Sequence, residues 1–332
     1  MVTRYVTQWL PGIFFGLAAA TPLVTRDAFF HDTVILILMW GAIAGAWNVA
    51  GGYAGQVSLG HAGFFGLGAY SVALLAVRWD LPAWSGMAVG AALSTIAGLI
   101  IGYLSNRLRG PYFALATIAF AQVLLIVASR WRELTKGSEG IPVPFRPGFA
   151  TLGFPSKVSW IYVALGFALA VWAVQTYLEH SRVGYQLAGV REDEDAAQAL
   201  GIHSRRLKIL AVAASAALTS IGGSLWAAYI GFVDPFYVFS IDLSIEFALK
   251  AIIGGTGAAL GPFLGSLLIT SLETYLRAQF SGVRTGFTGI YLIIYGCALI
   301  IVVRFFPRGL AGALAVAGRS GAAPVPQPAD AA

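Results

Sequence analysis

A charged segment between two long apolar runs constrains this chain more than any other feature. Residues 179–208 read EHSRVGYQLAGVREDEDAAQALGIHSRRLK, and the apolar runs on both sides of them are long enough to cross a lipid bilayer. A polar segment of this size cannot lie in hydrocarbon, where its backbone and charges would lose their hydrogen bonds. We therefore expect residues 179–208 to lie in water between two membrane spans.

The middle of this segment has the pattern of a short helix. Its apolar residues recur at roughly 3.6-residue spacing and are expected to share one face: Leu187, Val190, Ala197 and Leu200. Gly201 is expected to end the helix, because glycine accepts the left-handed conformation that follows many helix ends. An ordinary solvated loop helix would have the same pattern, so the pattern alone leaves the role of the segment open.

The composition places the whole chain in the membrane. Charged residues make up 11% of the sequence, against about 25% in a typical soluble domain, and the hydrophobic fraction is 58%. So few charges cannot solvate a folded surface of this size, whereas the forty glycines suit closely packed membrane helices. The sequence predicts an all-α integral membrane protein with several spans.

The apolar runs predict about ten membrane-spanning helices of the usual ~20 residues. They form a single transmembrane domain over residues 1–312, and the Ala- and Pro-rich tail, 313–332, is expected to be a disordered cytoplasmic segment. The spans are expected at residues 5–24, 33–50, the run that ends at 77, 84–104, 112–128, 158–178, 209–233, a short one at 243–253, 260–276 and 287–305.

Basic residues in short loops predict the orientation of these spans. They place residues 107–109, 205–208 and 304–308 in the cytoplasm, together with both termini. The loop at 129–157 carries five basic residues and yet must lie outside by the count of spans, which is the one disagreement with the rule. Spans two to five and seven to ten then run in opposite orientations, as two inverted four-helix halves would.

A glycine-rich stretch, residues 51–70, reads GGYAGQVSLGHAGFFGLGAY. So many glycines and polar groups favour either a tightly packed helix entry or backbone that leaves the helix beside a translocation path. Four side chains of this stretch are candidates for the path or its gate: Gln56, Ser58, His61 and Phe64. Hydrogen bonds between helices are the alternative role for the polar ones.

Ionisable residues inside apolar runs are costly and need a reason. Glu246 and Lys250 stand four residues apart with the acid first, which is the favourable order for a helical ion pair. We interpret them as a structural pair that braces the bundle. A proton or ion relay would need acids deep in several spans, and Glu273 is the only other candidate.

No catalytic or metal-binding motif is present in the sequence. It contains no GxxxxGK[ST] phosphate loop, no HExxH, no CxxC and no GxSxG, and the four histidines lack metal-ligand spacing. We therefore predict that the chain is not an enzyme, that it binds no metal or cofactor, and that it does not itself hydrolyse ATP.

Several blocks of sequence, in order, resemble the branched-chain amino acid ABC transporter permeases, and the M-type subunit most. They are GYAGQVSLGHAGFFGLGAY (52–70), RGPYFALATIAFAQV (109–123), SRVGYQLAGVREDEDAAQALGI (181–202), SIEFALKAIIGGTGAALGPFLGSLL (244–268) and RFFPRGLAG (304–312). The resemblance implies a type II importer architecture in the bacterial inner membrane. It also implies a homologous second permease, two cytosolic ATPase subunits that use ATP and magnesium, and a periplasmic or extracellular substrate-binding protein; nucleic acid plays no part.

The same resemblance implies a role for the charged segment. Its DAAQALG (195–201) is similar to the EAA-x-x-x-G pattern of importer permeases, with aspartate where glutamate is usual. That pattern belongs to the helix that docks on the ATPase. The residues expected to couple the chain to the ATPase are Arg191, Glu192, Asp195, Ala196, Ala197 and Gly201.

Two alternatives remain open from the sequence. Closely similar permeases carry urea, short amides, or aromatic and other carboxylates, so the cargo can differ while the fold stays the same. An ion-coupled secondary transporter is the alternative from another class; it would need intramembrane acids and would not need the charged segment.

Overall fold

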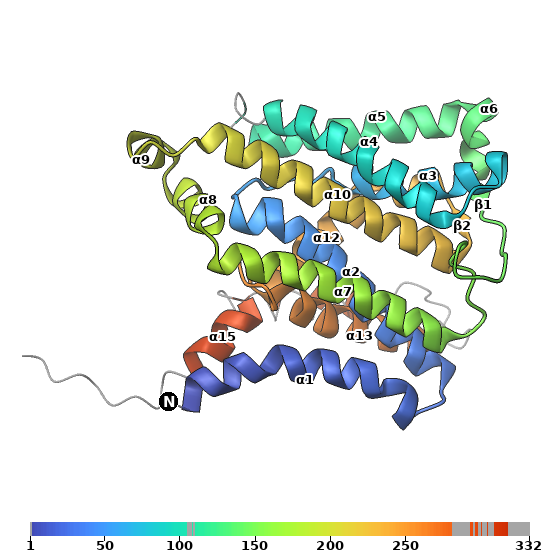
Figure 1. The fold of residues 1–332 in the computed structure, drawn as a ribbon, viewed down its shortest axis with the longest axis horizontal. Coiled ribbons are helices and arrows are strands. Elements are labelled where there is room, and N and C mark those ends of the chain that lie inside the picture. The colour runs from blue at the N-terminus through green and yellow to red at the C-terminus, as the bar shows by residue number, and fades with distance from the viewer. Residues whose placement is uncertain are drawn as a thin grey trace, which may run out of the picture.

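The chain folds into a bundle of helices in the computed structural model, which describes residues 2–104, 108, 110–280 and 309–317, with isolated positions at 293–294, 296–297, 300 and 304 (Figure 1). The elements are α1 (Val2–Val24), α2 (Ala28–Asn48), a π-helical turn η1 (Val49–Tyr53), α3 (His61–Trp79), α4 (Ala83–Leu104), α5 (Pro111–Arg130), α6 (Arg132–Thr135), a 3-10 turn η2 (Gly137–Glu139), β1 (Ile141–Pro142), α7 (Lys157–His180), α8 (Arg182–Glu192), α9 (Glu194–Ala199), α10 (Ser204–Ile230), β2 (Phe232–Val233), α11 (Pro235–Val238), α12 (Ile241–Gly254), α13 (Gly261–Phe280) and α15 (Gly309–Ala317).

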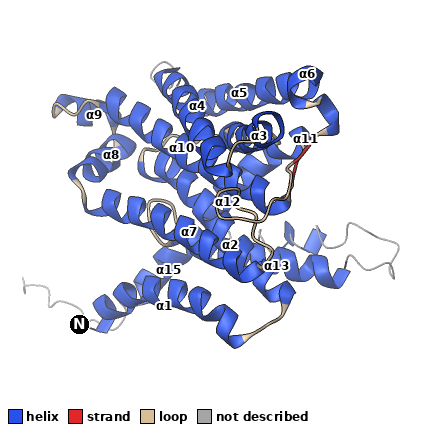
Figure 2. Ribbon diagram, turned by 45° about the vertical axis from the view of Figure 1, so that its right-hand side comes forward, coloured by secondary structure: helices blue, strands red, loops and turns tan. Residues whose placement is uncertain are grey.

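The predicted all-α class is confirmed, since the only strands among the described residues are β1 and β2, a two-residue antiparallel pair (Figure 2). In the described part of the chain, six helices are long and apolar enough to cross a membrane: α2 with η1, α3, α4, α5, α7 and α10. The other predicted runs at 5–24, 243–253 and 260–276 form α1, α12 and α13. The tenth predicted span lies largely outside the described residues, so the count of ten stays a prediction.

Glycines set the closest helix contacts in the bundle. A Cβ at Gly68 of α3 would lie 2.0 Å from the Ser220 carbonyl oxygen of α10, and one at Gly223 of α10 would lie 2.1 Å from the Phe65 carbonyl oxygen. Any larger residue at these positions would hold the two helices apart. In contrast, α4 and α5 carry exposed aliphatic side chains such as Ile96 and Ile126. We expect the surface that these side chains form to face lipid.

The two long polar segments lie at opposite ends of the bundle. Figure 1 shows α8 and α9 at the left-hand end of the bundle, the same end as α15 and the start of α1, and α6 with β1 and β2 at the other end. The charged segment and the 129–157 loop are thus separated by the length of the bundle, as the predicted topology requires. The assignment of one end to the cytoplasm stays a prediction.

The prediction of one short helix in the charged segment is wrong. Two helices, α8 and α9, meet at Asp193, whose extended backbone (φ −150°, ψ 109°) interrupts the helix. Leu200 does not share the buried face with Leu187, Val190 and Ala197, because its side chain is 83% exposed. The break at Asp193 shifts the helical phase, so a period counted across it fails.

Two predicted helix ends can be compared with the structure: the end of α9 and the start of the C-terminal tail. Gly201 follows α9 with φ +82°, as predicted for the residue that ends this helix. Helix α15 continues to Ala317, past residue 313 where the disordered tail was predicted to begin. Residues 318–332 lie outside the described part of the chain.

Candidate coupling site and polar pocket

Helices α8 and α9 (residues 182–199), which we call the α8–α9 hairpin, have one buried side and one exposed side. Leu187, Val190 and Ala197 are buried against the bundle, which anchors both helices to it. The Asp193 side chain starts α9 by accepting hydrogen bonds from the backbone nitrogens of Asp195 and Ala196 at 3.0 and 2.9 Å. The exposed side presents most of the residues predicted for coupling: Glu192, Asp195, Ala196 and Gly201.

Arg191 differs from the other predicted coupling residues, because it points toward the membrane helices. Its Nη1 donates a hydrogen bond of 2.8 Å to the carbonyl oxygen of Gly52 in η1. Its Nη2 and Nε donate to Glu192 Oε1 at 2.9 and 3.3 Å. A Cβ at Gly257, in the turn between α12 and α13, would lie 3.0 Å from Arg191 Nη1. Arg191 therefore joins the hairpin to η1 and lies close to the turn between α12 and α13.

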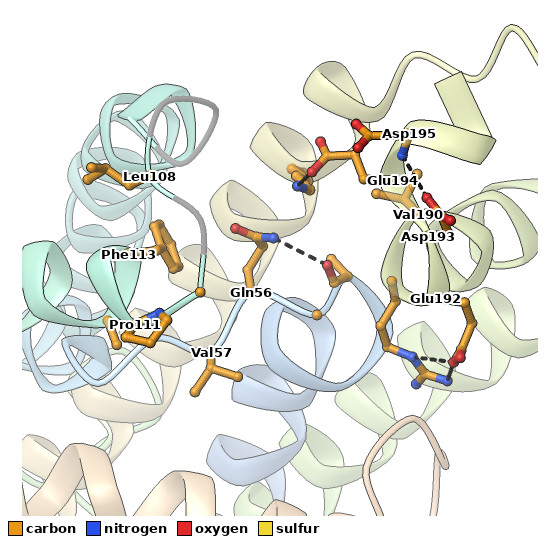
Figure 3. Close-up of a pocket in the computed structure, with 16 residues that line it drawn as sticks. Gln56, Val57, Leu108, Pro111, Phe113, Val190, Glu192, Asp193, Glu194 and Asp195 are labelled. Atoms are coloured by element: carbon orange, nitrogen blue, oxygen red, sulfur yellow. Dashed lines mark hydrogen bonds and ion pairs between the residues drawn. The ribbon is translucent and has the colours of Figure 1, made fainter. Parts of the chain in front are cut away.

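The hairpin and the glycine-rich segment enclose a pocket of about 660 Å³, which we call the polar pocket (Figure 3). Figure 3 shows the acidic side chains of the hairpin on one side and Gln56 with Pro111 and Phe113 on the other. The pocket is lined by residues 54–57, 108, 110–111, 113–114, 190–195 and 208. It lies where a movement of the hairpin would reach the loop that leads into α3.

An ion pair holds α9 to the first turns of α10 beside this pocket. Lys208 Nζ lies 2.5 Å from Glu194 Oε2, and the lysine side chain is almost fully buried while the glutamate is partly exposed. Gln198 of α9 adds a hydrogen bond of 2.8 Å from its Nε2 to Ser204 Oγ. The hairpin is thus fastened on one side to α10 and on the other, through Arg191, to η1.

The residues predicted for the translocation path occupy two different environments. Gln56 lines the polar pocket, whereas Ser58, His61 and Phe64 are buried among packed side chains. Residues 54–60 lie outside any helix, so the glycine-rich stretch does interrupt the helical backbone before α3. A role for these four residues in the path stays a prediction.

His61 belongs to a directed chain of hydrogen bonds. The Ser215 hydroxyl donates to the carbonyl oxygen of Ala46 at 2.6 Å, so it accepts from His61 Nε2 at 2.7 Å. His61 Nδ1 then accepts from the Ser58 hydroxyl at 2.9 Å. This chain ties the start of α3 to α2 and α10, which is the hydrogen-bonding role that the sequence left open.

A second polar network joins α2 and α7 to the turn between α12 and α13. Asn48 Nδ2 donates to Gln175 Oε1 at 2.8 Å, and Asn48 Oδ1 accepts from the Gly257 nitrogen at 2.9 Å. Glu179 Oε1 accepts from the Ala259 nitrogen at 2.6 Å. The sequence analysis did not select Gln175 or Glu179; the signal for Gln175 was a lone amide inside an apolar run.

The predicted pair of Glu246 and Lys250 is present as an ion pair within α12. Lys250 is fully buried, and its ammonium also lies 5.1 Å from the centre of the Trp40 ring. Over the described residues, no group of three or more His, Cys, Asp and Glu side chains is placed to hold a metal ion. The absence of a metal site stays a prediction.

Comparison with known proteins identifies the family. Residues 30–303 match the family described as branched-chain amino acid transport system / permease component. The chain is 28% identical over 318 residues to the high-affinity branched-chain amino acid transport system permease protein LivM of Escherichia coli K12, over 89% of this chain and 72% of that protein. It is 23% identical over 296 residues to LivH of Salmonella typhimurium, over 82% and 91% of the two chains.

A more distant relative has a different cargo in its name. The chain is 28% identical over 194 residues to the autoinducer 2 import system permease protein LsrC of Klebsiella pneumoniae, over 56% of this chain and 53% of that protein. The apolar helices and these permease relatives establish a multi-pass membrane protein with the role of an ABC importer permease. Since the family match extends over most of the chain, the protein belongs to the branched-chain amino acid transport system permease components.

Proposed function

We propose that this chain is the translocating subunit of an ATP-driven importer of branched-chain amino acids, and that it works by alternating access. The observation that carries the proposal is the link from the exposed α8–α9 hairpin through Arg191 to Gly52. A docked ATPase that moves the hairpin would move η1 and the loop into α3 with it, because the hydrogen bond joins them directly.

The hairpin is built to transmit force rather than to flex. The Lys208–Glu194 pair, the Asp193 cap and the buried Ala197 fix α9 against α10, so the hairpin would move as one body with the end of the bundle. Its outer side offers exposed charges and the apolar Leu200 side chain to a groove on the ATPase. ATP and magnesium would be bound on that partner, and this chain would perform no covalent chemistry.

The proposed assembly contains a homologous second permease, two cytosolic ATPase subunits and a periplasmic or extracellular substrate-binding protein. Similarity to both LivM and LivH, which are permease proteins of branched-chain systems, supports a pair of related permeases. The proposed location is the bacterial inner membrane, with the α8–α9 end and both termini in the cytoplasm.

The transported substrate has alternatives. The LsrC relative belongs by name to an autoinducer 2 system, so a permease of this kind can serve a cargo other than an amino acid. Urea, short amides and aromatic or other carboxylates are the further candidates. An ion-coupled secondary transporter remains the rival mechanism.

The test is co-purification of the tagged chain with its ATPase subunits, for wild type beside an Asp195→Lys, Gly201→Trp double variant. Both positions are exposed on the hairpin, and a side chain at Gly201 meets no atom within 4 Å, although its positive φ strains any larger residue. Glu133→Lys, an exposed acid on α6 at the opposite end, is the control for the change in charge. We expect the ATPases to accompany the wild type and the control and to be lost from the double variant.

Transport then separates the mechanisms. Wild-type chain that purifies alone and drives leucine uptake in proteoliposomes on an ion gradient without ATP would overturn the importer proposal. ATP-dependent uptake by the assembled complex, with leucine, isoleucine and valine preferred over urea and carboxylates, would support it.

A further inference from the structure

Two ion pairs on neighbouring helices form one charged group, which we call the charged ladder: Glu246, Lys250, Glu273 and Arg277. Glu246 pairs with Lys250 on α12, and Glu273 pairs with Arg277 on α13, in each case four residues apart. The Glu273 carboxylate also interacts electrostatically with Glu246 and with Lys250 across the two helices. The two ion pairs therefore lie close enough across α12 and α13 to influence each other electrostatically.

The ladder runs from one end of the bundle into its middle. Arg277 lies in the last turn of α13, at the end away from α8 and α9. Glu273 lies about 10 Å from the end of α13, counting seven residues from Phe280 at ~1.5 Å per residue. Lys250 lies over Trp40, which is close to the middle of α2. Charges are thus present from one end of the bundle to its middle.

The described residues of the chain leave both of these carboxylates partly exposed. The side chains of Glu246 and Glu273 are 26% and 28% exposed, although Lys250 is fully buried. A charged side chain at this depth facing lipid is costly. The exposed side of the ladder is therefore expected to face water or another polar surface rather than hydrocarbon.

Aliphatic side chains are also exposed on α12 and α13. Ile245 and Ile252 on α12 and Leu267 on α13 are exposed on the same pair of helices. The exposed surface of α12 and α13 therefore carries the two carboxylates, the guanidinium of Arg277 and these aliphatic side chains, while Lys250 is buried. A zwitterionic amino acid with an aliphatic side chain presents the complementary set: an ammonium for the carboxylates, a carboxylate for Arg277 and an alkyl group for the aliphatic side chains.

We propose that the charged ladder lines the water-filled substrate path and guides an aliphatic zwitterionic amino acid from the α6 end to the middle of the bundle. The inference rests on the proposed function for its cargo, but the water-filled path can be tested without it. The four charges of the ladder sum to zero, so no charge from a partner subunit is required to balance them.

The first test measures access of water to the ladder in membrane vesicles that contain the assembled complex. Glu246→Cys and Glu273→Cys are made in a Cys297→Ser background, since Cys297 is the single native cysteine. A membrane-impermeant, positively charged methanethiosulfonate reagent is added, with Ile96→Cys on α4 as the control because Ile96 is exposed among apolar side chains in mid-helix. We expect both ladder cysteines to react at least tenfold faster than the control, and leucine with its binding protein and ATP to slow them.

The second test uses isosteric variants, which keep the fold. Glu273→Gln is expected to lower ATP-dependent leucine uptake about tenfold at unchanged yield of complex, while Glu133→Gln leaves uptake unchanged. Ladder cysteines that react no faster than the Ile96 control would overturn the path. Fast reaction without protection by leucine, together with full uptake by the glutamine variant, would overturn the role in amino acid passage. The proposed function fails separately, if the wild-type complex imports no amino acid at all.

Discussion

The link between the hairpin and the membrane domain depends on one side chain, so Arg191→Ala is the most informative perturbation. It removes the 2.8 Å hydrogen bond from Nη1 to the Gly52 carbonyl oxygen and leaves the buried face of α8 intact. Hydrogen bonds from a charged donor contribute ~1.5–3 kcal/mol. The Arg191 side chain is 36% exposed, so we use the lower limit, ~1.5 kcal/mol, which is about a tenfold change in an equilibrium constant.

The expected result is a loss of coupling rather than a loss of assembly. In proteoliposomes with the complete importer, the ratio of substrate transported to ATP hydrolysed should fall about tenfold for Arg191→Ala, while the ATPases still co-purify. Glu192→Gln is the matched control, because it removes the exposed partner of Arg191 and keeps the bond to Gly52. An exposed pair of this kind contributes about 0–1 kcal/mol, so its effect should be much smaller. A wild-type ratio in Arg191→Ala, or an equal fall in both variants, would refute the coupling role.

Three further predictions concern stability in detergent, measured by thermal unfolding of the purified chain. Gly68→Val should prevent the close approach of α3 and α10 and abolish a monodisperse fold, whereas Gly166→Ala, with no atom within 4 Å of the added Cβ, should be neutral; equal behaviour would contradict the packing argument. His61→Ala removes two buried hydrogen bonds and leaves a cavity, and should cost about 2–4 kcal/mol; an unchanged midpoint would show that the bonds do not stabilise the fold. Glu194→Gln should destabilise more than Lys208→Met, because it leaves the nearly buried lysine without its carboxylate partner; the reverse order would show that the lysine is solvated.

The charged segment shows where sequence reasoning succeeds and where it stops. Its place outside the membrane and its end at Gly201 follow from local properties, the density of charge and the conformational freedom of glycine. The exposure of Leu200 does not, because Asp193 can serve either as an interior helix residue or as a cap. The contacts that decide between these states come from α10, which is distant in the sequence from α8.

Arg191 and the charged ladder show the same limit for long-range contacts. The spacing of Glu246 and Lys250 predicts their pairing, because both lie on one helix with a known period. The proximity of Glu273 to them, and of Arg191 to Gly52, depends on how α13 packs on α12 and how α8 packs on η1. The spacing of residues along one helix does not show how that helix packs against another.

The membrane class, the helical runs and the separation of the two polar segments can be predicted from the amino-acid sequence. These properties depend on hydropathy and charge summed over about twenty neighbouring residues, which is the length of chain that crosses a bilayer. Which polar side chains meet depends instead on helix packing: the bond from Arg191 to Gly52, the burial of His61 between two serines, and the ladder across α12 and α13. Glycine contacts such as Gly68 against Ser220 set the distances between helices, and those distances decide which side chains touch.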